Sequence, residues 1–284
     1  MTLKLQALTD ALDKGGNLNC DREFTERVQR RLSEATGHPD DPTVRYRASS
    51  IGKPWVVQTL DKWYGGKRQY TVAQCMTMLQ GMLSQEYIAE MLHLMDYEFE
   101  QEVTLKYKTV MGHADIVVHN GGEIHVLECK SMGTHLVNPF ANNPNDDYGY
   151  LSQLAFYWRC IADAHPTKKV TASFVLYDRG NSRIKCVPLT ESAMNRKVDR
   201  IQLAVDILTK IEPYDIDTLL REVVIPPTVD GKIMGGIART RWARILYAPH
   251  ETGTGVVYRL REPEDIAQML RNLPQERQDL EELL

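Results

Sequence analysis

The sequence predicts a protein of the α/β (α+β) class, in which helices flank a central mixed β-sheet. Apolar residues recur at helical spacing over residues 72–95, which predicts a long amphipathic helix. Two apolar runs, 116–118 and 124–127, flank Asn120-Gly-Gly122, a sequence typical of a β-hairpin turn. The elements that follow complete the order of helix, three strands, helix and strands: a helix over 148–164 and strands over 170–178 and 183–187.

The chain is expected to divide into a helical segment over 1–45, a core over 46–190, and a C-terminal helix with a mixed extension over 191–284, packed on the core. Helices are expected at 3–14 and 21–36 in the first part, where Asp21 can cap the second one. The remaining expected elements are, in order, a helix at 56–64, a strand at 98–108, a turn-rich loop at 138–147 and a helix at 191–211.

Composition limits the classes of function. The 284 residues include 43% hydrophobic ones, enough for a sizeable core, and the formal net charge is −4. A protein that coats nucleic acid through bulk charge is therefore excluded, and any DNA binding must use local basic patches. No apolar run is long enough for a membrane span or a secretory signal, so the expected location is the cytoplasm. The five cysteines form no Cys-x-x-Cys pair and are expected to be free structural thiols.

The hairpin carries three charged residues whose relative positions follow from turn geometry. If Gly121-Gly122 is the two-residue loop, Asp115 lies opposite Glu128. If Asn120-Gly121 is the loop, Asp115 lies opposite Val126, with Glu128 as its diagonal neighbour. Both registers place the carboxylates on one face, and because side chains alternate along a strand, Lys130 shares that face with Glu128. The three charged groups are therefore expected to converge.

A salt-bridged hairpin on the protein surface would explain the same three charges. The apolar runs beside them favour a buried site instead, where a charge without a partner is costly. Two carboxylates suit Mg²⁺ or Mn²⁺, which prefer oxygen ligands and bind phosphate oxygens. The hairpin is therefore a candidate metal site for cleaving phosphodiesters.

Two further segments carry cations. Residues 45–55 combine arginine, lysine and serine with a helix start, and such a combination can hold a phosphate. A Ser50 N-cap and a helix start containing Pro54 explain the same residues without any ligand. The C-terminal part has a second group of cations beside Trp242: Arg239, Arg241 and Arg244. This group is interpreted either as a DNA-tracking patch or as a solvated strand edge.

The order of these motifs resembles the PD-(D/E)XK nuclease superfamily, particularly its RecB-like and phage recombination exonuclease branches, lambda-type and YqaJ-like. The resemblance rests on Glu86, Asp115, Glu128-Cys129-Lys130 and Gln153-x-x-x-Tyr157, in that order. Gly81-x-x-x-Gln85-Glu86 is similar to the helix motif Gly-x-x-x-His-Glu, with Gln85 where a metal-binding His often stands. Gly112-His-Ala-Asp115 is similar to the Gly-x-x-Asp motif, and residues 47–55 are similar to a Ser-containing phosphate-contact motif. The resemblance covers about residues 45–190.

This resemblance implies a restriction-endonuclease-like core and metal-dependent hydrolysis of DNA. Asp115, Glu128 and the backbone carbonyl of Cys129 would hold one Mg²⁺ (or Mn²⁺) ion, and Glu86 would help to hold it or a second ion. Lys130 would orient or deprotonate the attacking water, with its pKa lowered by the neighbouring cation. The substrate would be positioned by Gln153 and Tyr157, and the phosphates of the strand by Arg47, Ser49, Ser50 and Lys53.

By the same resemblance, the expected activity is an exonuclease that resects linear double-stranded DNA from its 5′ end in recombination, repair or degradation. The implied partners are duplex DNA ends and a single-strand annealing or binding protein, with no membrane, in the host cytoplasm if the protein is viral. The alternatives are a structure- or sequence-specific endonuclease on the same fold, or a DNA-binding module without activity. No iron-sulfur cluster is expected, because Lys53 follows Gly52 where some relatives carry a cysteine.

Overall fold

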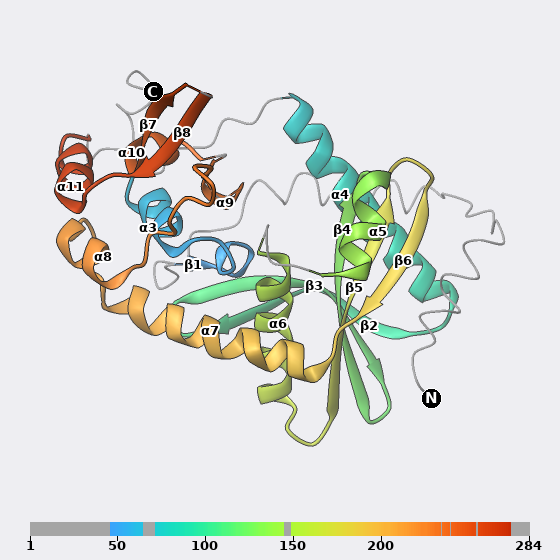
Figure 1. Cartoon of the computed structure of the whole chain (residues 1–284). Helices are drawn as coiled ribbons and strands as arrows, with labels where there is room; N and C mark the ends of the chain where they lie inside the picture. Colours follow the sequence, from blue (N-terminus) through green and yellow to red (C-terminus); the bar gives the residue numbers. More distant parts are fainter. Residues whose placement is uncertain are drawn as a thin grey trace.

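A mixed six-stranded β-sheet forms the centre of the protein, with helices on both of its faces (Figure 1). The computed structural model describes residues 46–64, 72–144, 149–233, 235–238, 240–253 and 255–273. The helices expected at 3–14 and 21–36 lie outside these ranges. The predicted class, a mixed sheet flanked by helices, is confirmed. The strands are Tyr46–Arg47 (β1), Glu98–Tyr107 (β2), Val110–Asn120 (β3), Glu123–Met132 (β4), Lys169–Asp178 (β5) and Arg183–Pro188 (β6).

The strand order is β1-β3-β4-β5-β6, and β2 pairs with β3. The β4–β5 and β1–β3 pairs are parallel, and the other neighbouring strands are antiparallel. Parallel neighbours need a crossover connection, and the chain between β4 and β5 provides one through the helix Tyr150–Ala164 (α6). The expected succession of helix, three strands, helix and strands is therefore found, with one additional helix before α6.

The hairpin between β3 and β4 adopts the first of the two predicted registers. Asn120 pairs with Glu123 and Ile116 with Leu127, so Gly121-Gly122 is the loop. Gly121 has φ +61°, a left-handed conformation that glycine adopts without steric cost. This register fixes the positions of both predicted acids.

The two faces of the sheet carry separate hydrophobic cores. The long helix Val72–Leu94 (α4) packs Ile88 and Leu92 with Leu127 of β4 in a small core. α6 packs on the opposite face, in a large core that includes Val126 of β4. Because Val126 and Leu127 are neighbours on one strand, their side chains point to opposite faces. The sheet is therefore buried on both sides, as the near-continuous apolar strands predict.

A helix replaces the first half of the loop expected at 138–147. Thr134–Asn142 (α5) continues from the end of β4 and contains Pro139. Its buried residues, Val137 and Phe140, are three apart and so share one helical face, which packs on the sheet. The Asn and Pro residues suggested a loop, but burial of this apolar pair favours the helix.

The C-terminal part packs on the large core, beside α6 and the helix Trp55–Tyr64 (α3). Its first helix, Glu191–Lys210 (α7), packs against α6 and crosses it in the view of Figure 1. The remaining elements are Ile216–Glu222 (α8), Gly235–Ala238 (α9), Ala243–Leu246 (α10), Tyr247–Thr252 (β7), Gly255–Leu260 (β8) and Pro263–Arg271 (α11). Buried residues from α7, α8, α10 and α11 belong to the same hydrophobic cluster as those of the sheet and α6.

Arg241 and Trp242 attach this part to α3. Trp242 is fully buried, and its indole N–H donates to Asp61 at 2.8 Å. The Arg241 guanidinium donates to the carbonyl oxygen of Tyr64 at 2.7 Å and stacks on the Trp242 ring. The predicted strand edge is wrong for Arg241, because this residue lies on no strand, and DNA contact by Arg241 remains a prediction. Arg239 lies outside the described residues, and Arg244 is exposed in α10.

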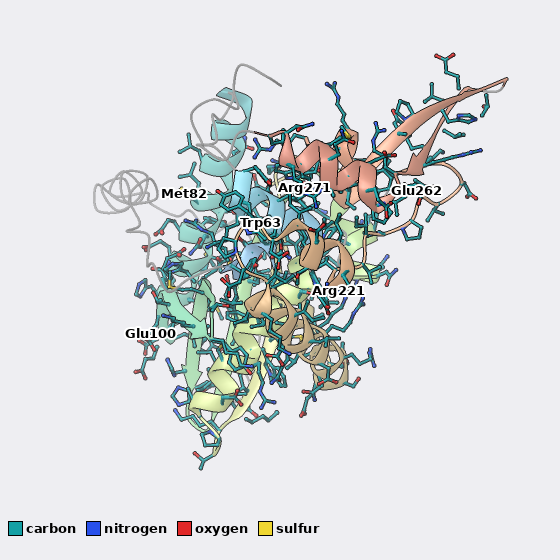
Figure 2. All side chains as sticks on the ribbon, turned by 90° about the vertical axis from the view of Figure 1, so that its left-hand side faces the viewer. Trp63, Met82, Glu100, Arg221, Glu262 and Arg271 are labelled. Carbon is teal, nitrogen blue, oxygen red and sulfur yellow. The ribbon has the colours of Figure 1, made fainter. Side chains whose placement is uncertain are left out.

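The β7–β8 hairpin projects from the C-terminal part (Figure 2). Most of its residues are exposed, and only Tyr247 at its base is buried. Within the part of the chain that the structure describes, no helix has the length and apolar composition needed to cross a bilayer.

Candidate functional site

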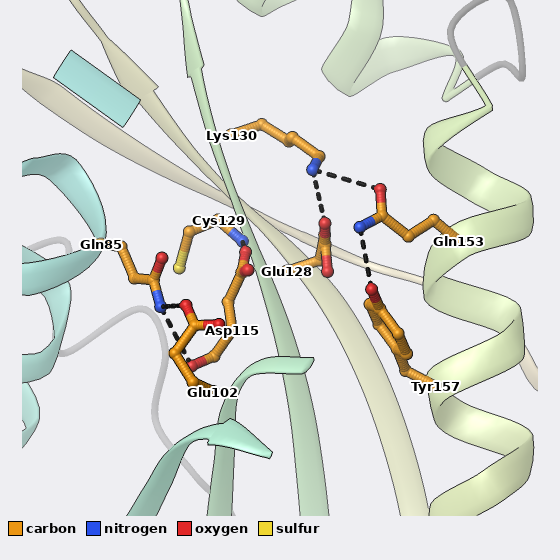
Figure 3. A network of polar contacts seen from close by, with 8 residues as sticks. All are labelled: Gln85, Glu102, Asp115, Glu128, Cys129, Lys130, Gln153 and Tyr157. Carbon is orange, nitrogen blue, oxygen red and sulfur yellow. Dashed lines mark hydrogen bonds and ion pairs between the residues drawn. The ribbon is translucent and has the colours of Figure 1, made fainter. Parts of the chain in front are cut away.

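The predicted acids lie where β3 and β4 separate. The backbone ladder between these strands ends at the pair Ile116 and Leu127, one residue before Asp115 and Glu128. Beyond that point the Cys129 backbone N–H donates to a side chain and not to a backbone carbonyl of β3. Its acceptor is Asp115 Oδ2, at 2.7 Å (Figure 3). The start of β3 pairs instead with β1. The two strands therefore form a fork, and both acids lie at its base.

The fork coincides with a change of face along β3. Ala114 packs in the large core and Ile116 in the small one, although residues two apart on a regular strand share a face. On β2, the backbone pairing with β3 likewise omits Glu102, which lies between the pairs Gln101–Ile116 and Val103–Ala114 and so opposite Asp115. Glu102 has φ +51°, which is uncommon for a residue other than glycine. The distortion of both strands therefore centres on Asp115 and Glu102.

Glu128 and Lys130 form a buried ion pair on the α6 side of the fork. Lys130 Nζ lies 2.5 Å from Glu128 Oε1. The Glu128 side chain is 0% exposed and that of Lys130 is 18% exposed. The second carboxylate oxygen, Glu128 Oε2, is buried and has no hydrogen-bond partner among the residues that the structure describes. A buried carboxylate oxygen without a partner is costly, so this atom fits a site for a cation.

Gln153 and Tyr157 extend this network from α6. The Lys130 ammonium donates to Gln153 Oε1 at 3.4 Å, and the Gln153 amide donates to the Tyr157 hydroxyl at 3.1 Å (Figure 3). Their four-residue spacing places both side chains on one face of α6, as expected. Lys130 also lies 4.7 Å from the centre of the Tyr150 ring, a cation–π contact that the sequence did not suggest.

Gly112 is needed where Tyr157 approaches β3. A Cβ atom on Gly112 would lie 2.7 Å from the Tyr157 hydroxyl and 2.5 Å from Ala48 Cβ. Both distances are shorter than real carbon contacts allow, so no larger residue fits without a shift of the backbone. The glycine of the Gly-x-x-Asp motif therefore allows α6 to contact the strand that carries Asp115.

The predicted phosphate-contact residues lie near the start of α6. Arg47 ends β1, and Ser49 and Ser50 belong to a single 3₁₀ turn, Ala48–Ser50 (η1). Gly52 lies against Gly149, because a Cβ on Gly52 would be 2.5 Å from Gly149 Cα, and this packing holds the loop beside the N-terminus of α6. Arg47 and Ser49 are exposed, while Ser50 and Lys53 are partly buried.

The alternative explanation of this loop, an N-cap by Ser50, is wrong. α3 begins at Trp55, and the amides of Val57 and Gln58 donate to the carbonyl oxygen of Pro54. Ser50 lies in η1, too far from the helix start to cap it. Contact of these residues with phosphate remains a prediction.

On the α4 side, Gln85 joins two of the acids. Its amide donates to Glu102 Oε1 at 2.7 Å and to the backbone carbonyl of Asp115 at 3.3 Å. Glu86, the predicted further ligand, is the next residue of α4 and is 2% exposed. Glu102 was missed by the sequence analysis. A two-residue turn at 108–109 would have placed it opposite Asp115, but its positive φ cannot be read from sequence.

Burial and mutual repulsion disfavour the charged forms of the acids. Burial, followed by the charge of Glu128, holds the pKa of Asp115 well above its ordinary value, against the opposing effects of Lys130 and the Cys129 amide. Burial also raises the pKa of Glu128, although Lys130 opposes this shift. Burial lowers the pKa of Lys130, but the charges of Glu128 and Asp115 outweigh it and leave that pKa above its ordinary value. Without an added cation, Lys130 is therefore a charged ammonium group.

These features test whether the site fits a divalent cation. Among the described residues, no three His, Cys, Asp or Glu side chains are arranged to hold a metal ion. The predicted set needs only two carboxylates, with the rest of the shell supplied by water and the Cys129 carbonyl, as is common for Mg²⁺. The Glu128 Oε2 atom and the raised pKa values of both acids fit such an ion, because a cation would offset the excess negative charge. Ligation by Asp115, Glu128, Glu86 and the Cys129 carbonyl remains a prediction.

Comparisons with known proteins add little to this description. No family model matches the chain, and no curated protein matches it. A solved structure titled "Crystal structure of SSO0001" aligns with 72% of this chain and 96% of its own, at 15% identity and a TM-score of 0.33. A similarity at this level carries no argument about function.

Proposed function

We propose that this protein is a metal-dependent deoxyribonuclease of the PD-(D/E)XK type. One observation carries the proposal: a fully buried glutamate, opposite an aspartate at a fork in the sheet, has one oxygen on a lysine and the other without a hydrogen-bond partner among the described residues. Glu123, in the pair with Lys169, also has a buried oxygen without a hydrogen bond, but that oxygen lies 3.6 Å from His125 Nε2 and the side chain is 26% exposed, whereas Glu128 is fully buried. The ordered motifs around this pair favour the same superfamily.

The proposed chemistry assigns a task to each side chain. A divalent ion held by Asp115 and Glu128 would polarise the scissile phosphate and lower the pKa of a bound water. Lys130, as an ammonium group, orients the attacking water and offsets the charge that develops on the phosphate oxygens. The Gln153 side-chain oxygen accepts a hydrogen bond from Lys130 and holds the ammonium in place, while the Gln153 side-chain nitrogen donates to the Tyr157 hydroxyl. The loop of Arg47, Ser49, Ser50 and Lys53 binds phosphates of the same strand.

The proposed substrate is linear double-stranded DNA, digested from its 5′ end. Linear and covalently closed circular duplexes should be incubated with the protein in Mg²⁺, in Mn²⁺ and in EDTA. Digestion of the linear duplex alone supports the exonuclease, and end labels identify the strand that is lost. Nicked circles would instead indicate an endonuclease on the same fold. An absence of cleavage in every condition would leave only DNA binding and would overturn the proposal.

The chain provides a matched control for the site. Glu123 and Lys169 form a second Glu–Lys pair on β4 and β5 at 2.8 Å, but both side chains are partly exposed. We expect Glu128→Gln and Lys130→Gln to lose at least 100-fold in cleavage rate, in line with the loss of a positioned charge in a water-excluded site. The variants Glu123→Gln and Lys169→Gln should retain the activity.

A further inference from the structure

A pocket of about 280 Å³ lies between α4 and the end of β5. Its α4 side is formed by residues at helical spacings of three, four and seven, which share one face of the helix. Its other side is formed by Tyr177, near the end of β5, and by Arg179, the residue after the strand. The lining residues are Gln80, Leu83, Ser84, Tyr87, Tyr177 and Arg179.

The pocket borders the candidate active site. Ser84 directly precedes Gln85, whose amide contacts Glu102 and Asp115. Tyr177 is the register partner of Ser131, which follows Lys130 on β4. The pocket therefore lies at the same end of the sheet as Lys130, but on the α4 face.

The chemical groups of the pocket suit a base and a phosphate. The Tyr87 and Tyr177 rings meet edge to face, with centroids 6.2 Å apart, and the exposed side chain of Leu83 continues the apolar surface. The Tyr177 hydroxyl donates to Ser182 and the Ser84 hydroxyl to Gly81, so both are occupied by protein partners. Within the described residues, the exposed Arg179 guanidinium makes one side-chain contact, a long one to Gln80 Oε1 at 3.5 Å. Ring faces and one guanidinium are therefore the groups offered to a ligand.

We propose that this pocket binds one unpaired nucleotide of the DNA, with its base on the tyrosine rings and its phosphate on Arg179. The inference rests on the proposed function, because the adjacent site must hold a DNA strand. The volume is close to the lower end of ligand pockets, roughly 300 Å³, which suits one nucleotide. A base inside a duplex is stacked on both faces and paired along its edge, so the paired interior of a double helix does not supply this ligand.

Binding should be measured in EDTA, where no metal-dependent cleavage occurs, with a blunt duplex and with the same duplex carrying a single-stranded overhang. We expect Arg179→Ala and Tyr177→Leu to weaken binding of the overhang substrate about tenfold and to leave blunt-duplex binding unchanged. Arg179→Ala should also reduce the salt dependence by about one phosphate contact. Arg183→Ala, an exposed arginine on the adjoining strand, is the matched control and should bind both substrates normally.

Competition identifies the ligand. A nucleoside monophosphate should displace the overhang substrate better than either the nucleoside or inorganic phosphate. Equal displacement by inorganic phosphate would overturn the inference and show only an anion site. An equal effect of the variants on binding of the blunt duplex would overturn it as well. Because all of these measurements are made without cleavage, their failure is distinguishable from a failure of nuclease activity in Mg²⁺.

Discussion

The Gln85 amide donates a 2.7 Å hydrogen bond to Glu102 Oε1 while it also contacts the backbone carbonyl of Asp115 at 3.3 Å. This bridge fixes the distorted pairing of β2 and β3 beside the proposed metal site. Replacing Gln85 with Leu should therefore loosen Asp115 and raise the Mg²⁺ concentration for half-maximal cleavage about tenfold, within the usual range for supporting residues of metal ligands. Glu102→Gln, which keeps an acceptor for Gln85, should change that concentration less. Equal effects of the two variants would contradict this role for the hydrogen bond.

Asp115 should make the metal-free protein less stable as pH rises. Its pKa in the folded protein lies above the unfolded value of about 3.9, so the folded state binds the proton more tightly. The unfolding free energy should be highest below that unfolded value and fall as pH rises through the folded pKa. Asp115→Asn keeps an acceptor for the Cys129 amide and removes this charge. In EDTA, urea unfolding should show that the stability of the variant relative to wild type increases from pH 4 to pH 8.

Divalent cations should reverse this penalty. Binding to the folded state alone stabilises it by about 2.7 kcal/mol at a ligand concentration of 100 times Kd. We expect Mg²⁺ or Mn²⁺ to raise the Tm of the wild-type protein in a concentration-dependent way, and EDTA to restore the lower value. The double variant Asp115→Asn, Glu128→Gln should show no shift. A full shift in that variant would place the cation elsewhere.

Gly112 should tolerate no side chain. Gly112→Ala would place its Cβ against Tyr157 and Ala48, so it should lower the unfolding free energy by about 1–3 kcal/mol. Gly122→Ala, in the loop between β3 and β4, is the control, because no atom lies within 4 Å of its added Cβ. Denaturant unfolding of the two variants tests this, and similar losses in both would show that the close contact with Tyr157 is not the cause.

Arg241 should matter for folding and not for DNA. Arg241→Ala removes the hydrogen bond to the Tyr64 carbonyl and the stacking on Trp242, so we expect a loss of about 1–3 kcal/mol in unfolding free energy. The salt dependence of DNA binding should stay the same, since no phosphate contact is lost. A reduced salt dependence with unchanged stability would restore the predicted DNA-tracking role.

Local sequence rules predicted much of this fold. The Gly121-Gly122 register followed from turn geometry and alternation, and both act over a few residues. Contacts that depend on distant elements were not predicted. The cation–π contact of Lys130 with Tyr150 needs α6 to cross the sheet, and the burial of Trp242 needs the C-terminal part to meet α3. The helix at Val137 and Phe140 was missed for the same reason, because the surface that covers its apolar face is far away in sequence.

Two glutamates of β4 each form an ion pair with a lysine: Glu123 at the start of the strand and Glu128 in its second half. At the turn, Glu123 is partly exposed and meets the exposed Lys169, so this pair keeps part of its hydration and can open at little cost. Five residues later, Glu128 is fully buried, so its charge must be balanced by the groups that the fold places beside it, such as Lys130. The two pairs have the same acid and the same base, so composition cannot distinguish them. The difference between them is burial, which separates a surface salt bridge from the glutamate–lysine pair of the proposed active site.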